Sequence, residues 1–493
     1  MRLCKLLGYG VTVCLVIFIG SARAQSDPPT GVFPPVIREF TPSLDPTGLV
    51  LTYNPDAPTV TATHPFFESL GTNGRACATC HEPRSAWGVS TASIQERFAQ
   101  SSGTDPIFRP IDGATCPSDD VSTLEAKQTA YNLLLTKGLI RIFLALPATT
   151  DFKIRVDDPY GCTTLHTNPP VVSVYRRPLP AANLVFLLNS VSDCQGRTSP
   201  PSSPPPGCTP LSIMWDGREP SLQSQAIDAT NGHAQASTPL TDDEISAIVA
   251  FETNIFDAQA VDFQAGYLAE EGATGGPVAL SKQEFFEGIN DVLTPGAFSP
   301  IIFTDYKAWE DLLSTDELSP AQASIARGEI VFNAQTFTIS GVNGLNLFAT
   351  DPLGGNPIVG TCGTCHDSPN VGNHSLKLPI DIGVPDAAPP ALDISGLPLF
   401  TVTCTGTGTY KGAPPKGYQF QVTDLGKATI SGHCADVGKV KGPILRGLAA
   451  RAPYFQNGSA ATLTDVVNFY NQRFNIGLNA QQTQDLVNFL NTL

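Results

Sequence analysis

Two short segments of the chain carry the same arrangement of reactive side chains. In each, two cysteines are separated by two residues and a histidine follows directly. The pattern occurs at Cys77, Cys80 and His81, and again at Cys362, Cys365 and His366. This C-x-x-C-H spacing is the attachment signature of c-type haem, in which two thiols add to the vinyl groups and the histidine binds the iron. The sequence therefore predicts two covalently bound haem c groups, with iron held by His81 and by His366.

Two other kinds of site also use closely spaced cysteines. A thioredoxin-like redox pair lies near a β-α-β pattern, and the sequence shows no such pattern around either motif. A zinc site needs two further ligands at matching spacing, and no partner pair of that kind appears. The spacing therefore favours haem attachment.

The start of the chain is typical of an exported protein. A basic beginning and an apolar run over residues 6–20 precede Ala22 and Ala24, as in a secretory signal peptide that is cleaved after Ala24. The run is shorter than a membrane span requires, so no stable span is expected after cleavage. We predict a periplasmic protein of Gram-negative type.

The other cysteines suit an oxidising compartment. The chain has 12 cysteines, of which two lie in the predicted signal peptide and four in the haem motifs. The remaining six, an even number in an exported protein, predict three disulfides. Proximity along the chain favours the pairs Cys194–Cys208, Cys116–Cys162 and Cys404–Cys434.

Helix signals dominate the rest of the chain. Capping boxes are expected to begin helices at Thr241-x-x-Glu244, Ser319-Pro320-x-Gln322 and Asn479-x-x-Gln482. We find no sustained alternation of apolar and polar residues, and 43 Gly and 43 Pro indicate long loops. We therefore predict a mainly α fold with little β structure and two cytochrome c-like haem lobes. The expected organisation is a signal peptide (1–24), an N-terminal haem domain (25–258), a connector (259–317) and a C-terminal haem domain (318–493).

The charge of the chain excludes one class of partner. Lys and Arg number 29 against 45 Asp and Glu, for a formal net charge of −16. Nucleic-acid binders need clustered basic residues to displace counterions. No nucleic-acid partner is therefore expected.

Three further blocks of sequence accompany the haem motifs. They are W-D-G-R at 215–218 followed by Leu222 and Gln225, K-x-K-x-P-x-L-R at 439–446, and A-P-Y-F-Q-N-G-S at 452–459 followed by D-V-V-x-F-Y at 465–470. Together with the haem motifs, these blocks resemble the bacterial dihaem cytochrome c peroxidase/MauG superfamily. In that superfamily the N-terminal haem reacts with peroxide and the C-terminal haem relays electrons.

The resemblance implies roles for the residues between and beside the haems. His81 would be the proximal ligand of the reactive haem, and Trp215 would couple that haem electronically to the haem of His366. The alternative is that Trp215 is an ordinary core residue, as large helical proteins commonly contain.

The sixth ligand of the relay haem departs from the commonest family pattern. Many peroxidases of the family place a methionine at the end of the D-V-V block, where this chain has Tyr470. No methionine follows Met214, so a downstream methionine ligand is excluded. Tyr470 matches the His/Tyr ligation of the MauG branch, in which a phenolate favours higher oxidation states. The alternatives are an aromatic packing residue at this position and ligation by His433 or His374.

On the peroxide side, the family needs an acid/base group that moves a proton between the two oxygens. Gln225 matches a family glutamine, but the family glutamate is absent from its expected place near Gln235. His233 is the nearest titratable group that could replace it, and Asp228 is the second. The alternative for His233 is an ordinary surface histidine.

Two further departures concern the surroundings of the haems. No histidine occurs between His81 and His166, so the switchable distal histidine of reductively activated relatives is missing. The resemblance then implies a reactive haem that is open without prior reduction. Pro178 stands where many relatives have a calcium-binding asparagine, and Gln456 stands where they have a histidine. The interlobe calcium ion of such relatives therefore lacks one of its ligands here.

The function that the resemblance implies is a periplasmic dihaem oxidoreductase that reduces hydrogen peroxide via a high-valent iron state. Electrons would come from a small donor cytochrome or from a protein substrate, as in the MauG branch. Two alternatives stay open. One is a dihaem dioxygenase that activates O2, and the other is a non-enzymatic electron-transfer cytochrome with both irons saturated.

Overall fold

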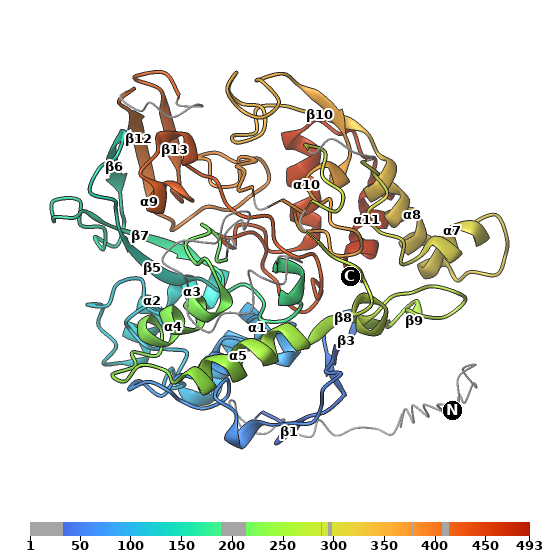
Figure 1. Cartoon of the computed structure of the whole chain (residues 1–493), viewed down its shortest axis with the longest axis horizontal. Helices are drawn as coiled ribbons and strands as arrows, with labels where there is room; N and C mark the ends of the chain where they lie inside the picture. Colours follow the sequence, from blue (N-terminus) through green and yellow to red (C-terminus); the bar gives the residue numbers. More distant parts are fainter. Residues whose placement is uncertain (1–32, 189–212, 287, 294–297, 377, 407–413) are drawn as a thin grey trace. The chain divides into compact units, whose positions relative to one another are not determined.

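Helices and small antiparallel sheets alternate along the chain (Figure 1). The computed structural model describes residues 33–188, 213–286, 288–293, 298–376, 378–406 and 414–493. The predicted signal peptide and the predicted Cys194–Cys208 disulfide lie outside the described residues. Among the helices of the described part, none combines the length and the apolar character that a membrane crossing requires.

The helices are short to medium in length. They are α1 (Thr91–Ser101), α2 (Leu124–Ala130), α3 (Asn132–Lys137), α4 (Leu222–Gly232), α5 (Asp242–Asn254), α6 (Pro277–Leu280), α7 (Lys307–Leu312), α8 (Pro320–Ala334), α9 (Ala428–Ser431), α10 (Leu463–Arg473) and α11 (Ala480–Leu490). The three predicted capping boxes are confirmed. Thr241, Ser319 and Asn479 cap α5, α8 and α11, and in each case the side chain three residues later bonds back to the cap.

In the described part of the chain, the strands form five sheets, each with antiparallel pairing. They are β1 (Val36–Ile37), β2 (Phe40–Leu44), β3 (Gly48–Tyr53), β4 (Thr59–Val60), β5 (Ile140–Ala145), β6 (Phe152–Asp157), β7 (Val171–Arg176), β8 (Phe256–Asp262), β9 (Gly266–Tyr267), β10 (Phe337–Ile339), β11 (Ile358–Gly360), β12 (Leu399–Cys404) and β13 (Gln419–Val422). The sheets have the orders β1-β4, β2-β3-β8-β9, β5-β7, β13-β12-β6 and β10-β11.

The prediction of a mainly α fold with little β structure was wrong. Within the described residues, helices make up 28% and strands 17%, so the protein combines both kinds of structure. The signal was present in part: β6 reads Phe-Lys-Ile-Arg-Val-Asp, an alternation with period two that suits a half-buried strand. Its partner β12 lies far along the chain, and such long-range pairing leaves no local trace in the sequence.

Strand pairing also joins the two predicted haem domains. β6, in the range 25–258, pairs with β12, in the range 318–493, from Asp157 opposite Leu399 to Phe152 opposite Cys404. Val172 of β7, Val402 of β12 and Val422 of β13 belong to one buried cluster. The predicted domain boundaries stay a prediction, but residues of both ranges contribute to one core.

Two of the predicted disulfides are confirmed. Cys116 is bonded to Cys162, and Cys404 at the end of β12 is bonded to Cys434. Closing a loop of about this length reduces the entropy of the unfolded chain and typically contributes about 2–4 kcal/mol to stability. The second bond ties the three-stranded sheet to the segment that follows α9.

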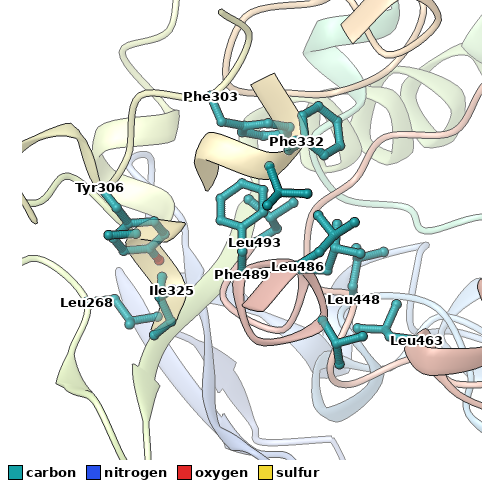
Figure 2. Close-up of a cluster of buried hydrophobic side chains, with 14 of the residues drawn as sticks. Leu268, Phe303, Tyr306, Ile325, Phe332, Leu448, Leu463, Leu486, Phe489 and Leu493 are labelled. Atoms are coloured by element: carbon teal, nitrogen blue, oxygen red, sulfur yellow. The ribbon is translucent and has the colours of Figure 1, made fainter. Parts of the chain in front are cut away.

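Side chains of α8, α10 and α11 and of the segments packed against them form a large apolar cluster (Figure 2). Phe332 of α8 and Leu463 of α10 belong to it, together with Leu486 and Phe489 of α11. Each fully buried side chain of this size contributes roughly 1.5–3 kcal/mol. The ring centroid of Phe332 lies 6.2 Å from that of His366, so this core also supports one side of the second haem motif.

Candidate functional site

The first motif forms a tight turn beside a cavity. Cys77–Thr79 is a 3-10 helix (η2), and the backbone N–H of His81 donates to the carbonyl of Cys77 at 3.1 Å. Nδ1 of His81 lies 2.9 Å from the carbonyl oxygen of Trp87. Because a carbonyl oxygen only accepts, Nδ1 carries the proton and Nε2 is left for a metal. Cys77, Cys80 and His81 line this cavity, which we call cavity 1.

The carbonyl that orients His81 is held in place by a strained turn. Ala86 and Trp87 have φ values of 50° and 58°, a left-handed conformation that bulky residues rarely adopt. The indole N–H of Trp87 donates to the hydroxyl of Thr52 at 2.8 Å, and that hydroxyl donates to the carboxyl of Asp257 at 2.8 Å. Burial lowers the pKa of His81 to about 4, so its ring is neutral at physiological pH, as a metal ligand must be.

The second motif repeats this arrangement. Cys362–Thr364 is a 3-10 helix (η6), and the backbone N–H of His366 donates to the carbonyl of Cys362 at 3.1 Å. Nδ1 of His366 lies 2.7 Å from the carbonyl oxygen of Gly372, which again leaves Nε2 for a metal. Burial lowers the pKa of His366 as well. The side chains of Cys362, Cys365 and His366 line a second cavity, which we call cavity 2.

The motif residues fit covalent haem better than the alternatives. Among the described cysteines, those outside disulfides are Cys77, Cys80, Cys362 and Cys365. Burial raises the pKa of all four thiols, and to about 12 for three of them, whereas a reactive redox pair needs a lowered pKa. No group of three or more Cys, His, Asp or Glu side chains within the described ranges is arranged to hold a metal ion. The cavities have similar volumes, about 170 and about 200 Å³, as expected if the same group occupies both.

Five residues line both cavities. The residues that line both are Arg177, Pro178, Trp215, Lys441 and Pro443, and we call them the dividing wall. The indole N–H of Trp215 donates to the carbonyl of Arg177 at 2.8 Å, and the backbone N–H of Lys441 donates to the carbonyl of Trp215 at 2.8 Å. Trp215, which lines both cavities, is therefore held by one hydrogen bond from its ring and one to its backbone carbonyl.

A buried ion-pair network anchors the residues next to the dividing wall. The guanidinium of Arg176 pairs with Asp216 at 2.5 Å and with Asp424 at 2.7 Å, and all three side chains are buried. Arg218 also reaches Asp216, at 3.2 Å. The W-D-G-R block is thus held by its charged residues while its tryptophan lies in the dividing wall.

The predicted acid/base residues lie on and after α4. Gln225 and His233 both line cavity 1, whereas Asp228 does not and its carboxyl is half exposed, 3.7 Å from Nε of Arg218. Nδ1 of His233 lies 2.5 Å from a carboxyl oxygen of Asp112. Nε2 is therefore the ring nitrogen of His233 that remains for a reactant.

Asp112 is not among the residues predicted from the sequence. Burial alone would raise its pKa, but an ion pair with Arg75 and the bond to His233 hold the pKa below its usual value. Asp112 is therefore an ionised, buried carboxylate that orients the His233 ring. The two residues are 121 positions apart, and no local pattern in the sequence connects them.

The candidate ligands for the second haem lie in different places. The hydroxyl oxygen of Tyr470, on α10, faces Nε2 of His366 at 3.5 Å, and both side chains line cavity 2. Burial raises the pKa of Tyr470. His374 also lines cavity 2, but its Nδ1 lies 3.1 Å from the carboxyl of Asp367. His433 is outside the lining of this cavity and lies beside Asp151, at 3.5 Å.

Part of the chain is similar in sequence to known proteins. Two proteins named Cytochrome-c peroxidase IdrP1, from Denitromonas iodatirespirans and from Pseudomonas sp. (strain SCT), are 30% and 32% identical over 143 residues. Cytochrome-c peroxidase IdrP2 from Pseudomonas sp. (strain SCT) is 35% identical over 139 residues. Each match covers 27% of this chain and 35–36% of the relative, so the matched segment spans little more than a third of these relatives.

No family model matches the chain. Among solved structures, a MauG-like protein associated with microbial copper homeostasis aligns over 87% of this chain and 86% of its own, with 15% identity and a TM-score of 0.35. The relatives named cytochrome-c peroxidase agree with the family that the two haem motifs and the three sequence blocks indicate. Over the matched segment, the chain is thus similar to bacterial proteins named cytochrome-c peroxidase.

Proposed function

We propose that this protein is a periplasmic dihaem oxidoreductase that reduces hydrogen peroxide to water with two electrons and two protons. The observation that carries the proposal is the His233–Asp112 pair, which presents an oriented imidazole to the cavity that also contains His81. Haem iron held by His81 would supply the redox centre for peroxide. An acid/base group beside such a centre is what peroxide cleavage requires.

Three residues that line cavity 1 have different roles in the transfer of protons. Nε2 of His233 would take a proton from one oxygen of peroxide and return it to the other, so that cleavage of the O–O bond releases one water. Two electrons from the donor and two protons then reduce the remaining oxygen to a second water. Asp112 accepts the Nδ1–H of His233 and stabilises the ring when it is charged. Gln225, also in the lining, can orient peroxide through its side-chain amide.

The residues around cavity 2 would deliver and store electrons. The hydroxyl oxygen of Tyr470 faces Nε2 of His366 at 3.5 Å, so both residues would hold the iron of a haem bound at this motif. A tyrosine ligand of this kind stabilises oxidised iron. Trp215 lines both cavities and would couple the two sites electronically. The electron donor is a small cytochrome or a protein substrate whose oxidation supplies both electrons.

Removing one haem motif at a time tests this division of roles. Cys77→Ala/Cys80→Ala and Cys362→Ala/Cys365→Ala are each expected to lower covalent haem from two to one per chain, measured as pyridine haemochrome. Stoichiometric peroxide should then change the absorption spectrum of the second variant but not of the first. Thermal unfolding of both variants controls for loss of the fold. The opposite assignment of the spectral response would show that the roles of the two motifs are reversed.

One observation favours a second candidate, an electron-transfer cytochrome. Met214 also lines cavity 1, and a thioether on the iron there would close the position that peroxide needs. Under our proposal, Met214→Leu leaves the spectrum of the as-isolated protein and its rate constant with peroxide unchanged. If the variant instead converts a low-spin haem to a high-spin haem, Met214 is a ligand and the electron-transfer function is favoured.

A further inference from the structure

Two buried arginines beside the cavities have no acidic partner. Arg177 lines both cavities and Arg451 lines cavity 2. The Arg177 guanidinium donates to the carbonyls of Val89 and Arg451, at 2.7 and 2.9 Å. The Arg451 guanidinium donates to the carbonyl of Ile444 at 2.7 Å. Neither arginine forms an ion pair with any carboxylate in the described part of the chain.

Neutral carbonyls satisfy hydrogen bonds but leave the charge uncompensated. Buried charges in proteins are normally paired with an opposite charge. Removing a charged group from water costs more free energy than hydrogen bonds from neutral groups restore. Here the two cations also repel one another: burial first, and then the charge of Arg451, lowers the pKa of Arg177 to about 9. Burial lowers the pKa of Arg451 to about 10, and Tyr454 and Asp257 oppose this shift. Burial raises the pKa values of these two acidic groups themselves, to about 12 for Tyr454 and about 8 for Asp257, so neither supplies a full negative charge at neutral pH. The cluster therefore lacks a negative group.

A second observation points to the same kind of ligand. Nε2 of Gln456 is buried without a hydrogen-bond acceptor, and Gln456 lines cavity 2. The backbone N–H of Arg177 donates to the carbonyl of Gln456 at 2.8 Å, so the orphan donor belongs to the arginine cluster. An unused amide donor beside two cations suits an anion that accepts hydrogen bonds, such as a carboxylate.

The predicted haems carry such groups. Haem has two propionate carboxylates on the edge of the ring opposite the vinyl groups, and the vinyl groups are the ones joined to the motif cysteines. Each ring would therefore direct its carboxylates away from its cysteines and across its cavity. We propose that Arg177 and Arg451, assisted by Gln456, form a binding site for haem propionates at the dividing wall. Arg177 serves both haems, and Arg451 and Gln456 serve the haem of His366.

This proposal rests on haem attachment at both motifs and is independent of the reaction with peroxide. Pyridine haemochrome absorbance tests attachment separately, with two haems per chain expected. The site itself is tested by reduction potentials of purified holoprotein, measured by spectroelectrochemistry between pH 5 and pH 9. The variants are Arg177→Gln, Arg451→Gln and Arg451→Lys. The matched control is Arg155→Gln, which removes the same charge from an exposed position on β6.

Arg451→Gln is expected to shift the potential of the His366 haem to more negative values, because a nearby cation favours the reduced iron. The shift should be accompanied by a new pH dependence, since a propionate without its cation holds a proton at higher pH. Arg177→Gln should shift both potentials. Arg451→Lys should restore most of the wild-type value, and Arg155→Gln should leave both potentials unchanged.

Three results would overturn the proposal. The first is full haem content with wild-type potentials at every pH in both glutamine variants. The second is Arg451→Lys behaving like Arg451→Gln, which would indicate a packing role. The third is a wild-type potential that changes with chloride concentration at constant ionic strength, which would mean that a free anion occupies the site. If Arg177→Gln does not fold, Arg451→Gln and the chloride titration still decide the matter.

Discussion

Replacing His233 by glutamine is expected to slow the reaction with hydrogen peroxide by about 10²–10⁴-fold, the contribution that a positioned acid/base group typically makes. The Nε2 of His233 is the nitrogen left for the reactant, because Nδ1 is bonded to Asp112. Glutamine preserves much of the side-chain volume but cannot accept and return a proton. The second-order rate constant is measured by stopped-flow absorbance of the as-isolated protein.

Asp112→Asn and Asp228→Asn form a matched pair of variants. They distinguish the two residues that the sequence offers for the acid/base role, His233, which Asp112 orients, and Asp228. Asp112→Asn should slow the reaction, since an amide no longer stabilises a charged His233 ring and allows the wrong tautomer. Asp228→Asn should leave the rate unchanged, because Asp228 is half exposed beside Arg218 and outside the lining of cavity 1. A slow Asp228→Asn variant together with a fast His233→Gln variant would transfer the acid/base role to Asp228.

A structural defect must be distinguished from a loss of proton transfer. Asp112→Asn leaves Arg75 without its buried partner, so part of its effect can come from a less stable fold. Cyanide binding provides the second readout, because hydrogen cyanide must give up a proton to a nearby base before it binds iron. If cyanide binds His233→Gln as fast as wild type, across pH 5–8, His233 is not the base.

Replacing Tyr470 by phenylalanine is expected to convert the His366 haem to a high-spin spectrum and to raise its reduction potential. The phenylalanine has no oxygen to coordinate, and loss of an anionic ligand favours the reduced iron. In the absence of a metal, burial raises the pKa of Tyr470, so coordination must supply the positive charge that removes the phenol proton. Absorption and electron paramagnetic resonance spectra, with spectroelectrochemistry, measure both effects.

The chain offers a close control for this variant. Tyr454 also lines cavity 2, but its hydroxyl donates to the carbonyl of Leu448 at 2.9 Å. Tyr454→Phe should therefore leave the spectrum of the His366 haem unchanged. If Tyr470→Phe leaves spectrum and potential unaltered while His374→Gln changes both, the ligand is His374 and our assignment fails.

The features that could be predicted from the sequence are those with short-range patterns. The haem motifs and the helix caps each occupy a few consecutive residues, because one turn of chain forms them. The disulfide pairs Cys116–Cys162 and Cys404–Cys434 were predicted from proximity alone and are present. Resemblance to a family supplied Trp215, which the structure places in the lining of both cavities.

The features that were missed depend on distant parts of the chain. β6 has its partner in β12, so the sheet that joins the two halves has no local signature beyond a short alternation. Asp112 acquires its significance from His233 and Arg75, neither of which is near it in sequence. Arg177 and Arg451 were not identified because an unpaired buried charge is visible only when the surroundings of both guanidinium groups are known.

The central claim is that the cavity at His81 accepts peroxide, and the most direct measurement is a peroxide titration of the as-isolated protein followed by its absorption spectrum. Our account predicts a high-spin component before peroxide is added, without any prior reduction. It also predicts a spectral change that is complete at about one equivalent and is reversed by an electron donor. Two low-spin, six-coordinate haems that do not change with peroxide would contradict it and would identify the protein as an electron carrier.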